Sequence, residues 1–185
     1  MTEKENWYVL RTYEDQEYEA LSLLESVIPK NLWSMCRIPE KLKVFRISGE
    51  LRLVKDILFP GYLFIQTAHP KELYKELKKS REFPQFLYFG KNETGEEMIP
   101  VSFLDLAFLQ NVCGPELQSP MGITEIVLGE NRQILKANGV LKNYINQIVR
   151  LNLHKRFAVA SIPLFNRSQT VLFGIRLEQD SCVVA

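Results

Sequence analysis

The first 112 residues combine two hydrophobic periods, the alternation of β-strands and the three-to-four-residue spacing of amphipathic helices. Trp7–Thr12 is rich in β-forming residues and predicts a strand, and the apolar stripe after it predicts a helix that Pro29 ends. Leu42–Ile47 and Leu51–Leu58 predict two strands that a turn at Ser48-Gly49 joins into a hairpin.

The pattern then continues as strand, helix, strand and helix. Tyr62–Thr67 alternates as a strand does, and residues 70–81 (PKELYKELKKSR) place leucines on one helical face and lysines on the other. Phe86–Gly90 predicts a short aromatic strand, and Ser102 with Asp105 three residues later predicts the start of a last helix. The order β-α-β-β-β-α-β-α predicts an α+β sandwich with helices mainly on one face of the sheet.

Beyond residue 113 the pattern changes to short strands without a helix. Gly114–Gly122 holds two prolines and two glycines and predicts a linker. Four apolar runs separated by turn residues then predict the strands of a small β-barrel: Gln133–Lys136, Ile145–Leu153, Phe157–Phe165 and Thr170–Ile175. We therefore predict a first domain over residues 5–113, a linker over 114–124 and a second domain over 125–183.

The strand after the turn dipeptide Pro60-Gly61 has apolar residues on both of its faces. If Leu63 and Ile65 lie beneath the helices, then Tyr62 and Phe64 lie on the open face of the sheet, with Phe59 just before the turn. The sequence therefore predicts an exposed aromatic patch.

One of Trp7 and Tyr8, on the neighbouring strand, also lies on this open face. The patch has three alternative interpretations. In the first, the patch docks onto an apolar protein surface, for which aromatic anchors are favoured. In the second, the aromatic rings stack on RNA bases, as in an RRM domain, although Pro60 stands where the RNP1 motif of such domains carries a cation. In the third, another element of the chain covers the patch.

Charge is distributed unevenly although the net charge is only +1. Between Asn131 and Leu177 there are eight basic residues and no acidic one. Such a segment is either a solvated module that happens to be basic or a surface that binds a polyanion.

Composition excludes several classes of protein. The 185 residues are 46% hydrophobic and 24% charged, without an apolar run long enough to span a membrane and without a secretory signal. Three distant cysteines fit a reducing cytosol, and neither histidine has a cysteine or carboxylate at metal-ligand spacing. Nucleotide-binding and hydrolase motifs are also missing, so we expect a cytoplasmic protein that is not an enzyme and holds no metal or cofactor.

Two segments resemble NusG-type transcription elongation factors. WYVLRTYEDQEYEALSLLE is similar to the first strand and helix of that family, and FPGYLFIQT is similar to its most recognisable motif. The stretch Glu130–Glu178 resembles the family's KOW domain. The resemblance implies an NGN domain, a linker and a five-stranded KOW barrel.

It also implies a partner, because NGN domains of this family dock on the clamp helices of RNA polymerase. The family's apolar docking patch, carried over to matching positions and their neighbours, comprises Phe59, Tyr62, Phe64, Phe86 and Tyr8. Bound there, the domain bridges the polymerase cleft, contacts non-template DNA and increases processivity.

The KOW stretch departs from the general factor. Asn143, Asn146 and Asn166 replace glycines of the family's turns, and Leu153–Ala158 resembles the turn of the LoaP subgroup of specialised antiterminators. That resemblance implies a monomer that binds an RNA hairpin in the leader of selected operons. The expected RNA-binding residues lie in and beside the KOW turns: Lys142, Tyr144, Arg150, His154, Lys155, Arg156 and Arg167.

Two other functions stay open. A general elongation factor would use its KOW domain to bind a ribosomal protein or Rho. An RNA-binding structural protein of the ribosome would use the same two domains without polymerase.

Overall fold

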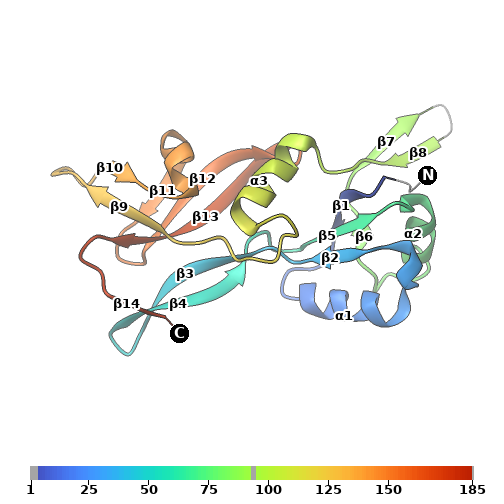
Figure 1. Cartoon of the computed structure of the whole chain (residues 1–185), viewed down its shortest axis with the longest axis horizontal. Coiled ribbons are helices and arrows are strands. Elements are labelled where there is room, and N and C mark those ends of the chain that lie inside the picture. The colour runs from blue at the N-terminus through green and yellow to red at the C-terminus, as the bar shows by residue number, and fades with distance from the viewer. Residues whose placement is uncertain (1–3, 93–94, 185) are drawn as a thin grey trace. The chain divides into compact units, whose positions relative to one another are not determined.

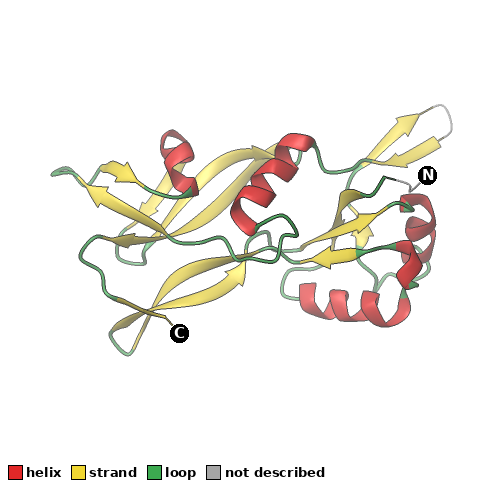
Figure 2. Ribbon diagram, viewed as in Figure 1, coloured by secondary structure: helices red, strands yellow, loops and turns green. Residues whose placement is uncertain are grey.

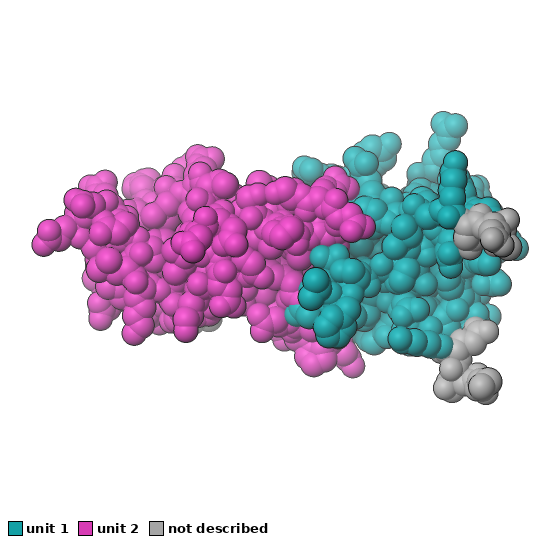
Figure 3. Space-filling model, turned by 90° about the horizontal axis from the view of Figure 1, so that it is seen from above, with its two compact units in different colours: residues 1–39, 59–107 teal, residues 40–58, 108–185 magenta. Residues whose placement is uncertain are grey.

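A computed structural model describes residues 4–92 and 95–184. Its contacts divide the chain into two compact units (Figure 3). The first unit holds Met1–Pro39 and Phe59–Ala107, and the second holds Glu40–Leu58 and Phe108–Ala185. The hairpin of residues 40–58 therefore belongs to the second unit, although it lies within the predicted first domain.

The first unit is built on a four-stranded antiparallel sheet with the order β2-β5-β1-β6. Its strands are β1 (Asn6–Arg11), β2 (Met35–Arg37), β5 (Tyr62–Thr67) and β6 (Gln85–Phe86). The helices α1 (Glu17–Val27) and α2 (Pro70–Leu77) lie on one side of this sheet (Figure 1), with the short helix η1 (Lys30–Leu32) between α1 and β2. A separate hairpin pairs β7 (Phe89–Asn92) with β8 (Gly95–Met98).

Local sequence accounts for several of these boundaries. The alternating run predicted as Tyr62–Thr67 is strand β5 with the same ends, and it pairs along its whole length with β1. The last helix, α3 (Phe103–Cys113), follows Ser102. The Ser102 hydroxyl accepts a hydrogen bond from the Asp105 N–H (3.1 Å) and donates one to its carboxylate (2.8 Å). This reciprocal cap confirms the predicted start of the helix.

The second unit contains a curled five-stranded sheet with the order β10-β9-β13-β12-β11 (Figure 2). Its strands are β9 (Thr124–Leu128), β10 (Ile134–Ala137), β11 (Ile148–Asn152), β12 (Phe157–Leu164) and β13 (Arg167–Leu177). A 3₁₀ segment, η2 (Val140–Gln147), lies between β10 and β11. The predicted fold class, a helix-bearing sheet followed by a small five-stranded β-structure, is confirmed.

A second, three-stranded sheet in this unit joins the two halves of the sequence. The hairpin of β3 (Glu40–Ile47) and β4 (Glu50–Ile57) turns at Ser48 and Gly49, and β14 (Cys182–Val184) runs parallel to β4. The hairpin turn was predicted from sequence. The pairing with the C-terminal strand was not, because no local pattern reports a partner that far along the chain.

The hairpin also lies directly on strand β13, at a position without a side chain. A Cβ atom on Gly174 would lie 2.6 Å from the Leu42 carbonyl oxygen and 2.9 Å from the Lys43 Cα. Only glycine allows two backbones to approach this closely without displacement. The contact between β3 and β13 therefore depends on Gly174.

Residues of the predicted linker pack in the second unit. Leu117 and Met121 are both almost fully buried. The Met121 carbonyl accepts a hydrogen bond from the Leu42 N–H (2.7 Å), and the Met121 N–H donates to the Glu40 carbonyl (2.9 Å). This segment is thus bonded to the hairpin, in contrast to the free connection that its prolines and glycines suggested. No helix among the described residues is long and apolar enough to cross a membrane.

Candidate functional site

The FPGY motif forms a tight turn at the start of β5. The Tyr62 N–H donates to the Phe59 carbonyl (3.2 Å), Pro60 occupies the second position, and Gly61 has a φ of +80° at the third. This is the residue pattern of a type II β-turn, which requires a positive φ at its third residue. Proline and glycine at these positions therefore have a structural cause.

A buried carboxylate fixes this turn from α1. The Glu17 side chain is 1% exposed, and its Oε1 accepts a hydrogen bond of 2.6 Å from the Gly61 N–H. The Thr12 N–H donates to the Gly61 carbonyl (2.9 Å). Both polar groups of Gly61 are thus bonded, and Phe59 and Tyr62 leave the turn in defined directions.

The aromatic residues at this turn are less exposed than the sequence suggested. Phe59 and Phe64 contact each other with ring centroids 6.2 Å apart, and they are 4% and 0% exposed. Tyr62 is half-buried. The prediction of an exposed patch is wrong for the two phenylalanines, because alternation places a residue on a face without showing whether that face is covered. Of the three, Tyr62 alone is partly exposed.

Tyr8 and Phe86 lie on the opposite face of the sheet. Tyr8 pairs with Ile65 in the strand register, whereas Phe64 pairs with Val9, so Tyr8 and Phe64 point to opposite sides. The Phe86 ring contacts Tyr8 (5.6 Å between centroids) and Tyr74 of α2 (6.2 Å). The structure therefore separates these two residues from Tyr62 and places them in the core beneath the helices.

The basic turn of the second unit borders a cavity of about 400 Å³. His154, Lys155 and Arg156 form one wall, from the turn between β11 and β12. Lys43 and Arg46 of β3 contribute cations to the other wall. None of the ten described residues that line the cavity is acidic. Three of the predicted RNA-binding residues thus meet at a single basic cavity.

Arg156 is held by an ion pair inside this unit. Its Nε and one Nη donate to the two carboxylate oxygens of Asp180 (2.6 and 2.7 Å), and its other Nη donates to the Leu153 carbonyl. The two side chains are only 14% and 6% exposed. The Arg156 hydrogen bonds lower the pKa of the Asp180 carboxyl below its usual range. Arg156 therefore shapes the turn and supplies less charge to a ligand than the sequence suggested.

The remaining predicted RNA-binding residues do not gather at the same place. Arg150 lies over the ring of Phe157, which lines the cavity, at 5.4 Å from its centroid. Lys142 is exposed on η2. Arg167 begins β13, at the far end of β12 from the basic turn, about 25 Å away at 3.3 Å per residue. Arg167 therefore does not join the cations of the basic turn, because successive turns of a meander lie at opposite ends.

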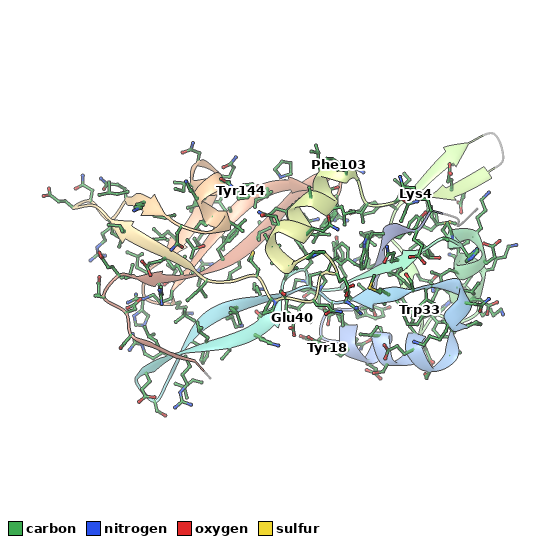
Figure 4. All side chains as sticks on the ribbon, viewed as in Figure 1. Lys4, Tyr18, Trp33, Glu40, Phe103 and Tyr144 are labelled. Atoms are coloured by element: carbon green, nitrogen blue, oxygen red, sulfur yellow. The ribbon has the colours of Figure 1, made fainter. Side chains whose placement is uncertain are left out.

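Tyr144 is committed to packing and does not offer a free ring. It stacks on the buried Phe173 (6.4 Å between centroids) and makes an edge contact with Phe108 of α3 (5.9 Å). Figure 4 labels its position on η2. Burial raises the pKa of its hydroxyl. The prediction that Tyr144 binds RNA has no support from this geometry.

The β3–β4 hairpin is also part of this site, which the sequence patterns did not indicate. Phe45 is 55% exposed and lines the cavity together with Arg46. The predicted strand Leu42–Ile47 carries an aromatic residue and cations that the core does not use, which could have indicated a binding surface. That this strand lies beside residues 153–156 follows only from the tertiary structure. Across residues 4–92 and 95–184, no three His, Cys, Asp or Glu side chains gather closely enough to hold a metal ion.

Comparisons with known proteins find a matching family model, a similar protein and a similar solved structure. A family model described as "Transcription termination factor nusG" matches residues 5–109, more than half of the chain. The chain is 21% identical over 175 residues to the "Transcription termination/antitermination protein NusG" of Thermus thermophilus, covering 89% of this chain and 92% of that protein. A solved structure described as "Domain interaction in Thermotoga maritima NusG" is similar with a TM-score of 0.46 and 19% identity, over 92% of this chain and 94% of that one.

Proposed function

Because this chain belongs to the NusG family of transcription factors, we propose that it is a specialised antitermination and processivity factor. Its first unit docks on the clamp helices of RNA polymerase, where it also reaches non-template DNA. Its second unit binds a hairpin in the leader RNA. The observation that carries this proposal is the basic cavity of the second unit, whose described lining has four Lys and Arg residues and no acid.

The docking residue that the geometry favours in the first unit is Tyr62. The turn bonded to Glu17 fixes its position at the start of β5, and the residue is half-buried, so part of it is available to a partner. A rigid aromatic ring in this state loses little conformational entropy on binding and is typical of an interface anchor. Phe59 and Phe64 support Tyr62 from within the unit. The family model ends at residue 109, which supports a functional boundary near the predicted linker.

The RNA-binding role of the second unit is supported by its charge. The stretch from Asn131 to Leu177 carries eight basic residues without an acid, and the cavity adds Lys43 and Arg46 from the hairpin. Neutralised phosphates release counterions, so a surface of this kind favours nucleic acid. A general factor that binds a ribosomal protein has no need for it. An RNA-binding protein of the ribosome would share the basic surface but would not bind polymerase, which the next experiment tests.

Replacing Tyr62 by alanine is expected to weaken binding to RNA polymerase by about 2 kcal/mol, or thirtyfold, because an interface anchor is lost. The measurement is equilibrium binding of the purified chain to core RNA polymerase. Phe64→Ala is unsuitable, because removing a fully buried ring would cost about 3 kcal/mol or more of stability.

Val27→Ala is the control, since Val27 is 56% exposed at the opposite end of α1 from Glu17, about 15 Å away at 1.5 Å per residue. Circular dichroism verifies that both variants are folded. Equal affinities of folded wild type, Tyr62→Ala and Val27→Ala would show that Tyr62 is not part of the docking surface.

A further inference from the structure

We propose that the cavity between β3 and the turn at residues 153–156 is a pocket for one unpaired nucleotide of a structured RNA. Arg46 and Lys155 neutralise its phosphate, and Phe45 stacks on its base. The proposal rests on the proposed RNA-binding function of the second unit and adds the hairpin β3–β4 to it.

The size and build of the cavity suit a ligand of this kind. Its volume of about 400 Å³ lies within the range of roughly 300–1,000 Å³ that pockets for small ligands occupy. Its walls come from segments more than a hundred residues apart in sequence. The close contact at Gly174 and the pairing of β4 with β14 hold these walls together before any ligand arrives. A preformed pocket avoids the entropic cost of ordering its walls on binding.

The cavity keeps uncompensated positive charge. Asp56 is shared by Lys43 (2.9 Å) and Lys41 (3.4 Å), so one carboxylate faces two cations. Asp180 forms its ion pair with Arg156, and Arg46 is a second cation acting on it. In the part of the chain that the structure describes, the Lys155 ammonium has no carboxylate partner. Arg46 donates one guanidinium N–H to the Gly49 carbonyl (2.9 Å). Its remaining N–H groups and the Lys155 ammonium are therefore the donors that the cavity can offer to an anion.

An exposed aromatic ring beside these cations points to a nucleotide. Phe45 is 55% exposed and lines the cavity together with the buried Val44 and Leu51. Aromatic rings stack on bases of any sequence once the bases are unpaired, and cations alongside track the phosphates. A paired A-form stem hides its base edges in a deep, narrow groove, so the nucleotide must come from a loop or bulge. A phosphate-binding site alone would not require an exposed phenylalanine.

The test uses the full chain and two RNA probes. The first is an RNA hairpin that the wild-type chain selects from a pool with randomised loops, and the second is a blunt duplex with the same stem. Phe45→Ala is expected to weaken hairpin binding about tenfold through lost stacking and to leave duplex binding unchanged. Arg46→Ala is expected to weaken hairpin binding about tenfold and to flatten the log–log salt dependence by about one unit. Lys55→Ala is the matched control, because Lys55 lies on the same hairpin, is exposed and does not line the cavity.

The outcomes separate this proposal from the proposed function. If wild type binds the hairpin but Phe45→Ala and Arg46→Ala bind it as tightly as Lys55→Ala, the pocket is wrong and the RNA-binding function stands. If Phe45→Ala weakens binding to the RNA hairpin and to the duplex equally, the proposed pocket is also wrong, because the ring would then not distinguish an unpaired base. If polyglutamate displaces the RNA hairpin at concentrations at which free nucleotides do not, the cavity binds an acidic protein and not a nucleotide. Failure of wild type to bind any hairpin would overturn both the pocket and the RNA-binding function.

Discussion

Replacing Gly174 by alanine is expected to lower the free energy of unfolding of the second unit by about 3 kcal/mol, because the added Cβ would overlap backbone atoms of β3. The overlaps are with the Leu42 carbonyl oxygen and the Lys43 Cα, at 2.6 and 2.9 Å. Backbone atoms of a paired strand cannot rotate away as the end of a side chain can. The hairpin must therefore separate from β13, and the cavity lined by both would open.

Denaturant unfolding measures the loss, and hydrogen exchange of the β3–β4 amides locates it. Gly122→Ala is the control, since a Cβ there meets no atom within 4 Å. Alanine is a better residue than glycine in a strand interior, so local backbone preference alone would make Gly174→Ala slightly more stable. Unchanged stability and unchanged exchange of the hairpin amides would show that the hairpin does not pack on β13.

Replacing Asp180 by alanine is expected to cost about 3 kcal/mol of stability at neutral pH, because it leaves the largely buried Arg156 guanidinium without its carboxylate. The Leu177 N–H loses its acceptor as well, at 2.7 Å from Asp180. Asp180 lies two residues before β14, so the change also releases the strand that pairs with β4. Urea denaturation of the two proteins measures the difference.

The loss of stability in Asp180→Ala should depend on pH in a defined direction. Because the folded-state pKa of Asp180 is lowered by Arg156, its contribution is complete above the unfolded-state pKa of about 3.9. It is lost as the pH falls through the lower, folded-state pKa. The stability difference between wild type and Asp180→Ala should therefore shrink below about pH 4. Glu178→Ala, at an exposed neighbouring carboxylate, should show little difference at either pH. A difference that stays constant into strong acid would exclude the ion pair as its cause.

Sequence patterns predicted elements whose cause is local. Strand β5 has the predicted bounds, and the turns at Ser48-Gly49 and before Phe157 and Arg167 separate the strands as expected. Alternation and turn residues determine these features over a few positions. The three-residue β2 and the parallel pairing of β14 were missed, because so short a strand has no measurable period and its partner is distant.

The candidate site was harder to predict because its decisive contacts are tertiary. Nothing near Arg156 in sequence shows that Asp180, 24 residues later, pairs with it. Likewise, Phe64 belongs to the face that alternation assigns, yet it is fully buried. The resemblance to a family supplied the expected partner, but the placement of Phe45 beside Lys155 required the structure.

A bridging assay tests most directly whether this chain joins RNA polymerase to a structured RNA, as we propose. Core polymerase is immobilised, and a fluorescent form of the RNA hairpin selected by the chain is added with increasing amounts of the chain. We expect retention of the RNA hairpin to rise with the concentration of wild type and of Val27→Ala, and we expect Tyr62→Ala to retain far less. Polymerase that binds the chain but retains no hairpin above the level seen without it would contradict the account.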